Sequence, residues 1–218
     1  MKKVRLPKSL DGYKYIGNFT DMPLSLGMVY KLDDKNFIPA IHFNDVYPDV
    51  DLAGITDHGS QASMKFSRES EVGFDFGASG SSNLGESEVR ISFRKKNAVA
   101  GVVTDLQSST IRYRNIIKQL DELWDDQGFS RFRKDYIFVF QVDTAAACTL
   151  IYSMQSNNTV TLAHRAGEPV TNFAALGSGE FEYVSNSKET LEIIRPTACK
   201  PLFKAFWFRK NGEPELVG

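Results

Sequence analysis

Residues 62–76 read ASMKFSRESEVGFDF, and this stretch decides the fold. Its even positions are mostly apolar and its odd positions polar, a period of two that is typical of a strand burying one face. Residues 88–94, EVRISFR, repeat the alternation with the apolar side chains at odd positions. Residues 77–85 between them are rich in Gly and Ser and gain little from ordering. The pattern predicts a long amphipathic β-hairpin with a mobile tip, interrupted on its apolar face by Arg68 and Ser70.

A second alternating stretch occupies residues 142–154. Residues 156–159, SNNT, are a turn signal because Asn tolerates positive φ, and apolar residues alternate again through residues 160–164. These features predict a second amphipathic hairpin. The apolar residues of the two hairpins are our candidates for contact with membrane lipid. They are Met64, Phe66, Val72, Phe74, Phe76, Val89, Ile91 and Phe93 in the first, and Leu150, Tyr152, Val160 and Leu162 in the second.

The period changes in residues 108–127, where apolar residues follow helical spacing and Gly128 can end the segment. We expect one long amphipathic helix there. Further strands are expected at residues 24–30, 37–43, 136–140, 190–194 and 202–208. The predicted fold class is α+β, with a twisted, predominantly antiparallel sheet that carries long amphipathic hairpins. We expect residues 1–208 to form a single domain and residues 209–218 a short polar C-terminal tail.

The composition is that of a globular protein. The chain has 218 residues, 42% of them hydrophobic, and a net charge of −1, so we expect no nucleic-acid partner. Its apolar runs fall far below the ~20 residues of a spanning helix, and its N-terminus lacks the apolar core of a signal peptide, which predicts a cytoplasmic protein at rest. Cys148 and Cys199 are expected to be buried thiols rather than a disulfide or a metal pair.

Sequence motifs of enzyme chemistry do not occur. The histidines His42, His58 and His164 lie far apart, and the chain has neither a nucleophile elbow nor a phosphate-binding loop. Asp49 and Asp51 are the best candidates for a cation site, although an ordinary polar loop is the simpler interpretation. We therefore expect no catalytic residues, no metal and no cofactor.

Basic residues cluster beside the predicted hairpins. Such residues near strand ends favour an anionic lipid surface, at about 1 kcal/mol each close to the bilayer. Taken singly, each cluster is explained by ordinary solvated charge, so the case for lipid rests on the position of the clusters beside the two hairpins. The candidates are Lys2, Lys3, Arg5 and Lys8 at the N-terminus, Arg94, Lys95 and Lys96 after the first hairpin, and Arg131 and Arg133 before the second.

Short motifs follow one another in a characteristic order. They are VRLP at residues 4–7, PLSLG at 23–27, the long amphipathic stretch, the helix, DYIFVF at 135–140 leading into the second hairpin, and PLFKAF at 201–206. Over most of the chain this order resembles the bacterial gasdermin-like pore-forming proteins. The chain differs from some bacterial members in lacking an early cysteine, so acylation is not implied.

The resemblance implies a latent pore former without enzymatic activity, monomeric and autoinhibited at rest. An activating protease would cut near Arg209, Lys210, Asn211 and Gly212 and release an inhibitory tail. The two hairpins would then enter the lipid of the inner membrane as part of a homo-oligomeric ring, in a cell-death defence against phage. The alternative is a soluble, non-enzymatic, β-rich binding or interaction module. A third hypothesis is an enzyme whose site is assembled from distant residues.

Overall fold

The chain folds into antiparallel sheets with a few short helices. The structure, a computed structural model, describes residues 9–10, 15–18, 23–33, 36–78, 87–129, 135–164, 170–186, 189–209 and 212–217. Unit 1 comprises Met1–Gly59, Gln107–Asp143 and Leu202–Gly218, and unit 2 comprises Ser60–Leu106 and Thr144–Pro201. The unit boundaries fall inside four strands, β5 (Thr56–Phe66), β8 (Ala98–Ile111), β9 (Tyr136–Ala145) and β14 (Cys199–Phe208), which therefore contribute residues to both units.

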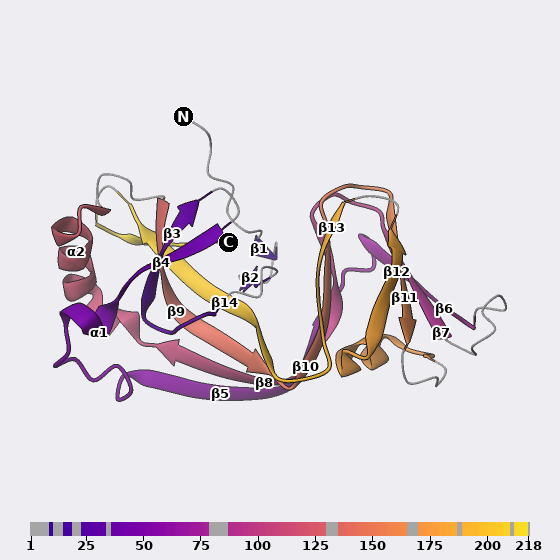
Figure 1. Cartoon of the computed structure of the whole chain (residues 1–218), viewed down its shortest axis with the longest axis horizontal. Coiled ribbons are helices and arrows are strands. Elements are labelled where there is room, and N and C mark those ends of the chain that lie inside the picture. Colours follow the sequence, from indigo (N-terminus) through magenta and orange to yellow (C-terminus); the bar gives the residue numbers. More distant parts are fainter. Residues whose placement is uncertain are drawn as a thin grey trace. The chain divides into compact units, whose positions relative to one another are not determined.

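Unit 1 is built around an aromatic core. Its further elements are β1 (Ser9–Leu10), β2 (Tyr15–Gly17), β3 (Met28–Asp33), β4 (Asn36–His42), α1 (Phe43–Val46), the 3-10 helix η1 (Tyr113–Ile116), α2 (Ile117–Asp126) and β15 (Pro214–Leu216) (Figure 1). β3 pairs with β4 and β9, and β14 pairs with β2 and β15, all antiparallel. In the core, the Phe206 ring lies 4.8 Å from that of Tyr113 and 5.4 Å from that of Phe138, measured between centroids.

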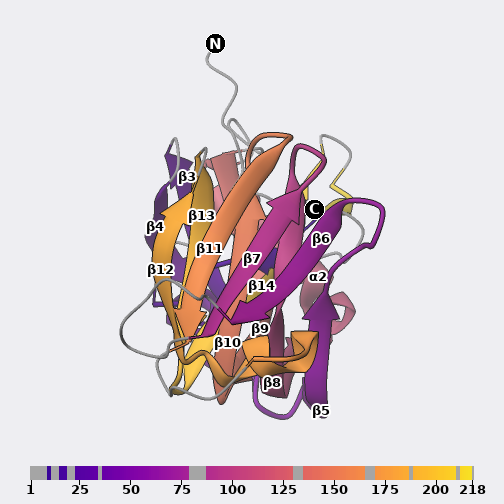
Figure 2. The ribbon, with the colours of Figure 1, turned by 90° about the vertical axis from the view of Figure 1, so that its right-hand side faces the viewer.

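Unit 2 contains a four-stranded sheet and part of a larger one. Its further elements are β6 (Val72–Ala78), β7 (Ser87–Phe93), β10 (Ala147–Ser153), β11 (Asn158–His164), the 3-10 helix η3 (Phe173–Ser178), β12 (Phe181–Asn186) and β13 (Thr190–Arg195). The smaller sheet has the order β12-β11-β7-β6, and Figure 2 shows these strands side by side. All of its pairs are antiparallel, as are those of β10 with β8 and β13. These pairings confirm the predicted α+β class with its mainly antiparallel sheet.

The helical segment is shorter than residues 108–127, the range that the sequence pattern predicts. β8 continues as a strand to Ile111, and α2 begins only at Ile117, after η1. The first residues of the predicted helix remain extended because β8 pairs with β5 there. At the end of that pair, the N–H of Arg112 donates a hydrogen bond to the carbonyl oxygen of Ile55 over 2.9 Å. Tertiary pairing has overridden the local helical period.

The rest of the predicted helix is correct. α2 buries the expected apolar stripe through Leu120, Leu123 and Trp124. Gly128 follows with a φ of 69°, the left-handed conformation that ends helices and that glycine adopts without strain. The additional strands predicted from the sequence are present as β3, β4, β9, β13 and β14, although β3 begins at Met28 rather than at residue 24.

The first predicted hairpin is divided between two strand pairs. β6 pairs with β7, which places Val72 opposite Phe93, whereas β5 pairs with β8. The predicted arm of residues 62–76 is therefore interrupted between β5 and β6. Residues 79–86, which include most of the predicted mobile tip, lie outside the residues that the structure describes.

The second predicted hairpin is wrong. The turn exists, with Asn157 at a φ of 52° and the Asn158 side chain donating to the Ser153 hydroxyl over 2.8 Å. However, β10 pairs with β8 and β13, and β11 pairs with β7 and β12. β10 is buried along its whole length and thus behaves as a central strand, with both edges already paired. Its apolar residues do not face those of β11 across a hairpin.

Candidate functional site

Residues 56–111 form one hairpin nested inside another. The inner pair is β6 with β7, and the outer pair is β5 with β8. In the outer pair His58 lies beside Ser109, with Nδ1 and Oγ 3.2 Å apart, while Ile55 lies beside Arg112. One residue number rises as the other falls, so the outer strands are antiparallel like the inner ones. The four strands thus form two antiparallel pairs within one stretch of chain, and residues 98–104 of β8 pair with β10.

The chain passes between sheets at two short connections. β5 and β8 belong to the larger sheet, and β6 and β7 belong to the four-stranded sheet. Residues 67–71 connect β5 to β6, and residues 94–97 connect β7 to β8; we call these two connections the joint. They are adjacent in space, because the N–H of Arg94 donates to the carbonyl oxygen of Glu71 over 2.8 Å. The two arms therefore bend at positions that are adjacent in space.

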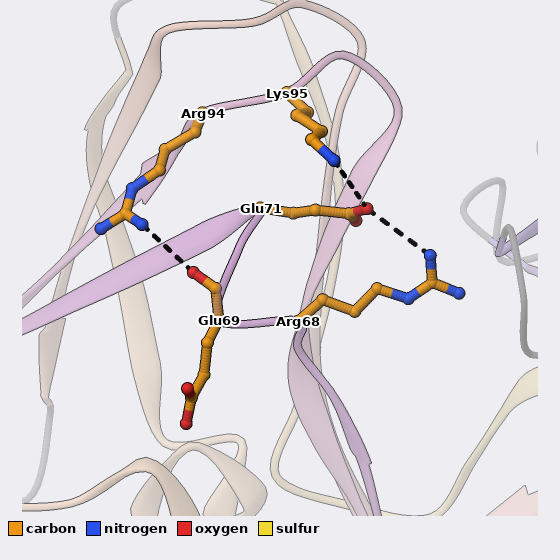
Figure 3. Close-up of polar contacts among 5 residues, drawn as sticks. All are labelled: Arg68, Glu69, Glu71, Arg94 and Lys95. Atoms are coloured by element: carbon orange, nitrogen blue, oxygen red, sulfur yellow. Dashed lines mark hydrogen bonds and ion pairs between the residues drawn. The ribbon is translucent and has the colours of Figure 1, made fainter.

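Glu71 lies between two cations in the joint. Its Oε1 is 3.5 Å from Nη1 of Arg68 and 3.7 Å from Nζ of Lys95 (Figure 3). Nη1 of Arg94 donates to the backbone carbonyl oxygen of Glu69 over 3.2 Å, while the Glu69 carboxylate points away from the cluster (Figure 3). The Glu71 side chain is 21% exposed, against 47% for Arg68 and 61% for Lys95. Ion pairs this accessible contribute about 1 kcal/mol or less each.

Backbone hydrogen bonds also close the bend. The N–H groups of Glu71 and Val72 both donate to the carbonyl oxygen of Arg68, over 2.8 and 2.9 Å. Bonds between residues three and four apart belong to a tight turn and cannot persist in an extended strand. Straightening the first arm would therefore break them.

Straightening would also separate Glu71 from its two cations. If the β6–β7 register continued through the joint, Arg68 would lie opposite Asn97, and Ser70 would lie opposite Lys95. Side chains alternate between the faces of a strand, so Arg68 and Lys95 would share one face and Glu71 would point from the other. The polar interruption of the apolar face that the sequence displays thus coincides with the joint.

The hairpin candidates are buried or partly buried in the folded chain. Eight of them belong to the apolar core of unit 2 or pack against it, together with side chains of β8, β10 and η3: Val72, Phe74, Phe76, Val89, Ile91, Phe93, Val160 and Leu162. Phe74 is partly buried and packs edge-on against Phe173 of η3, with centroids 4.6 Å apart. Met64 and Phe76 are also partly buried. The buried candidates are Phe66, Val72, Val89, Ile91 and Phe93, and also Leu150, Tyr152, Val160 and Leu162 on β10 and β11.

Of the anionic-lipid candidates, the described residues include those at the joint. Arg94 and Lys95 make the contacts given above, and Lys96 is exposed. The other candidates, Lys2, Lys3, Arg5, Lys8, Arg131 and Arg133, lie outside the described residues.

The C-terminal tail is docked as a strand in unit 1. β15 pairs with β14, and the indole N–H of Trp207 donates to a carboxylate oxygen of Glu215 over 2.9 Å. Nε of Arg209 lies 3.2 Å from the same oxygen. Val217 is only 3% exposed, and its N–H donates to the carbonyl oxygen of Ala205 over 2.9 Å. The tail is therefore held by ionic, backbone and apolar contacts.

The candidate cleavage region lies between β14 and β15 in the sequence. Arg209 is exposed, and its N–H donates to the carbonyl oxygen of Glu213 over 2.8 Å. Gly212 has a φ of 77°, and its N–H donates to the carbonyl oxygen of Arg209 over 3.0 Å. Lys210 and Asn211 lie outside the described residues.

Sequence reasoning missed a buried polar cluster in unit 1. Asp143 is 0% exposed; its Oδ1 accepts a hydrogen bond from Gln141 over 2.8 Å, and its Oδ2 has no hydrogen-bond partner among the described residues. Burial raises the pKa of the Asp143 carboxyl, against smaller lowering effects of Gln141, Ser108, Lys204 and Tyr15. In the sequence, Gln141 and Asp143 occupy the polar positions of an alternating strand. β9 is instead buried on both faces, which no local pattern reveals.

The described residues do not form a metal-binding cluster. Within the described ranges, no three His, Cys, Asp or Glu side chains converge on a point that could hold a metal ion. Asp51 accepts a hydrogen bond from the N–H of Gly54 over 3.0 Å, as in an ordinary polar loop. Among the helices that the structure describes, none has the length and apolar character needed to cross a bilayer.

The sequence matches no protein-family model and no curated protein.

Proposed function

We propose that this chain is a latent, non-enzymatic membrane-permeabilising protein of the gasdermin type, whose nested hairpin straightens as it enters lipid. The observation that carries the proposal is the pairing of residues 56–111, in which β5–β8 and β6–β7 are successive halves of one long hairpin. The joint lies between these halves, as do residues 98–104 of β8, which pair with β10 at rest and would have to leave it. Continuous arms would span residues 56–78 and 87–111, longer than the ~9–11 residues with which a β-strand crosses a bilayer.

The straightened hairpin would carry an apolar face of suitable height. Between the joint and the tip, this face would present the apolar side chains of β6 and β7. Residues 69–78, which include residues 69–71 of the joint, provide about ten positions, which suits a tilted strand crossing an apolar band about 25 Å tall. Arg68 and Lys95 would lie at the edge of that band, where anionic headgroups attract cations.

The docked tail supports the proposed autoinhibition, in which the tail keeps the protein inactive until it is cut. Cleavage of the turn after Arg209 would release β15 and leave the backbone of Phe206–Phe208 without the pairing that β15 provides at rest. An unpaired strand edge is a template for pairing with another chain. We propose that this change permits a homo-oligomer to form on the inner membrane from a cytoplasmic monomer, and that the resulting leakage serves cell-death defence.

Dye release from liposomes tests the proposal. A recognition sequence for a site-specific protease is inserted between Lys210 and Asn211, and the folded full-length chain is then cut. We expect the cut chain to release dye from phosphatidylglycerol liposomes, with less release from phosphatidylcholine liposomes, and the uncut chain to release none. A cut chain that stays folded and releases no dye from either liposome would contradict the proposal.

Phe74 and Asp75 provide matched variants, since they are neighbours on opposite faces of β6. Phe74→Lys places a charge on the face proposed to meet lipid, which costs ~2–4 kcal/mol near the bilayer midplane, so it should abolish release by the cut chain. Asp75→Lys alters the exposed face and should preserve release. Circular dichroism confirms that both variants are folded. Equal release by the two would show that this face does not meet lipid.

A second candidate, a non-enzymatic binding module, is favoured by one observation. Phe66, Val89 and Ile91 are each 0% exposed, as ordinary core residues are. If the folded, cut chain never permeabilises liposomes, the hairpin is permanent core. The binding module then replaces the pore-forming protein as the proposed function.

A further inference from the structure

The two cysteines of the sequence are neighbours in unit 2. Sγ of Cys148, on β10, lies 3.4 Å from Sγ of Cys199, at the start of β14, and neither cysteine forms a disulfide. From this contact we propose that Cys148 and Cys199 are a reversible redox pair that closes to a disulfide when a small-molecule disulfide such as oxidised glutathione is the oxidant. The proposal does not depend on membrane activity.

The surroundings of the two thiols set the order of reaction. Cys148 is 0% exposed, whereas Cys199 is partly exposed and follows three exposed residues, 196–198. The hydrogen bond with Cys199 and burial both raise the pKa of the Cys148 thiol, so Cys148 stays protonated at neutral pH. An oxidant therefore meets Cys199 first.

The exchange balances as two successive displacements. The Cys199 thiolate attacks one sulfur of glutathione disulfide, and the first glutathione leaves as a thiolate. The Cys148 thiol then loses its proton to solvent and attacks the Cys199 sulfur, which displaces the second glutathione. The two protein thiols lose two electrons and two protons, which the oxidant gains as two glutathione thiols. A dithiol reductant reverses both steps.

Closure would tie β10 to the start of β14. The bond would enclose residues 149–198, which include β11, β12, β13 and η3. A cross-link over a segment of this length restricts the unfolded chain, so the oxidised protein should have a Tm higher by about 5–10 °C.

The test exposes the full-length protein to oxidised glutathione and then measures free thiols and disulfide-linked peptides by mass spectrometry. We expect both thiols to be lost, one peptide pair to be linked through Cys148 and Cys199, no glutathione to be retained, and dithiothreitol to restore both thiols and the original Tm. Two free thiols after oxidation, or one retained glutathione per chain, would overturn the proposal.

Single variants test the order of attack. Cys148→Ala removes the resolving thiol, so glutathione should remain attached to Cys199. Cys199→Ser should react with no glutathione, because the buried Cys148 cannot begin the exchange. Glutathione attached to Cys148 in the Cys199→Ser variant would contradict the assigned order, and this variant remains informative if Cys148→Ala does not fold.

Discussion

Asp143 lies on β9 away from solvent, with one carboxylate oxygen hydrogen-bonded to Gln141. Loss of hydration disfavours the charged form and raises the carboxyl pKa above its ordinary value of 3.8. The folded state therefore holds this proton more tightly than the unfolded state does. The corresponding contribution to stability is fully present below the unfolded pKa, and it is lost as the pH rises through the folded pKa.

Asp143→Asn should remove this pH dependence while keeping the shape of the side chain and a contact with Gln141. The stability of the wild type relative to the variant should fall as the pH rises from about 4, and it should level off above the folded pKa. Urea unfolding between about pH 4 and pH 8 measures the difference. Asp75→Asn, at an exposed position, is the control and should follow the wild type. A difference that does not change with pH would contradict the raised pKa.

Gly101 on β8 marks a close approach to β10. Its φ is 149°, and a Cβ built there would lie 1.9 Å from the carbonyl oxygen of Thr149. Gly101→Ala must therefore move backbone and should destabilise the protein by about 3 kcal/mol in urea unfolding. Gly59→Ala on β5 is the control: its Cβ would meet nothing within 4 Å, so its effect should stay within about 0.5 kcal/mol. Similar stability of the two variants would refute the close approach.

At the scale of the elements, the sequence identified strands better than it identified their partners. Alternation is a property of neighbouring residues, so it predicted strands at β6, β7, β10 and β11 correctly. Pairing depends on distant residues: β10 takes residues 98–104 and 190–195 as partners, and the turn at residues 156–159 only leads the chain from one sheet into the other. The helix prediction failed at residues 108–111 for the same reason, because β5 lies beside them.

The candidate site was only partly predictable. Arg68 and Ser70 stood out in the sequence because they break an apolar face, but this pattern does not show whether a strand bends there. The ion pair between Arg68 and Glu71 has i,i+3 spacing, which helices also use, so it indicates no joint by itself. Lys95 reaches Glu71 because the two connections of the joint are neighbours in space. The sequence alone does not show that they are neighbours.

Glu71→Gln should loosen the joint because it removes the charge shared by Arg68 and Lys95. The change in global stability should be about 1 kcal/mol or less, since the ion pairs are exposed. Amide hydrogen exchange should become faster in residues 67–71 and 94–97, and dye release by the cut chain should begin sooner. Both effects follow if opening the joint precedes insertion.

Glu69→Gln is the matched control for Glu71→Gln. It removes a carboxylate from the same connection, but Glu69 contacts Arg94 through its backbone carbonyl, which the substitution preserves. Hydrogen exchange and dye release should therefore match the wild type. If both variants speed up release equally, general loss of negative charge rather than the Glu71 ion pairs controls the rate.

At the scale of the whole molecule, the contacts of the C-terminal tail depend on the path of the chain more than on the composition of the tail. Three separate segments build unit 1, and the last of them carries the tail. Residues 209–218 looked like a polar appendage because their sequence, RKNGEPELVG, has few apolar residues. One of those few, Val217, is buried, and Glu215 joins Trp207 to Arg209. A single apolar residue gives no periodic signal, so docking of the tail was not predictable from the sequence.

If docking of the tail restrains the protein, weakening it should activate the uncut chain. Val217→Asp places a charge at a position only 3% exposed, so the tail should leave β14 to keep that charge in water. The full-length variant should then form oligomers on phosphatidylglycerol liposomes without proteolysis, as measured by sedimentation with the liposomes and size analysis after extraction. Leu216→Asp, at a neighbouring position that is 47% exposed, should remain monomeric. If Val217→Asp also stays monomeric while the cut chain permeabilises the same liposomes, cleavage activates the protein by a route other than undocking the tail.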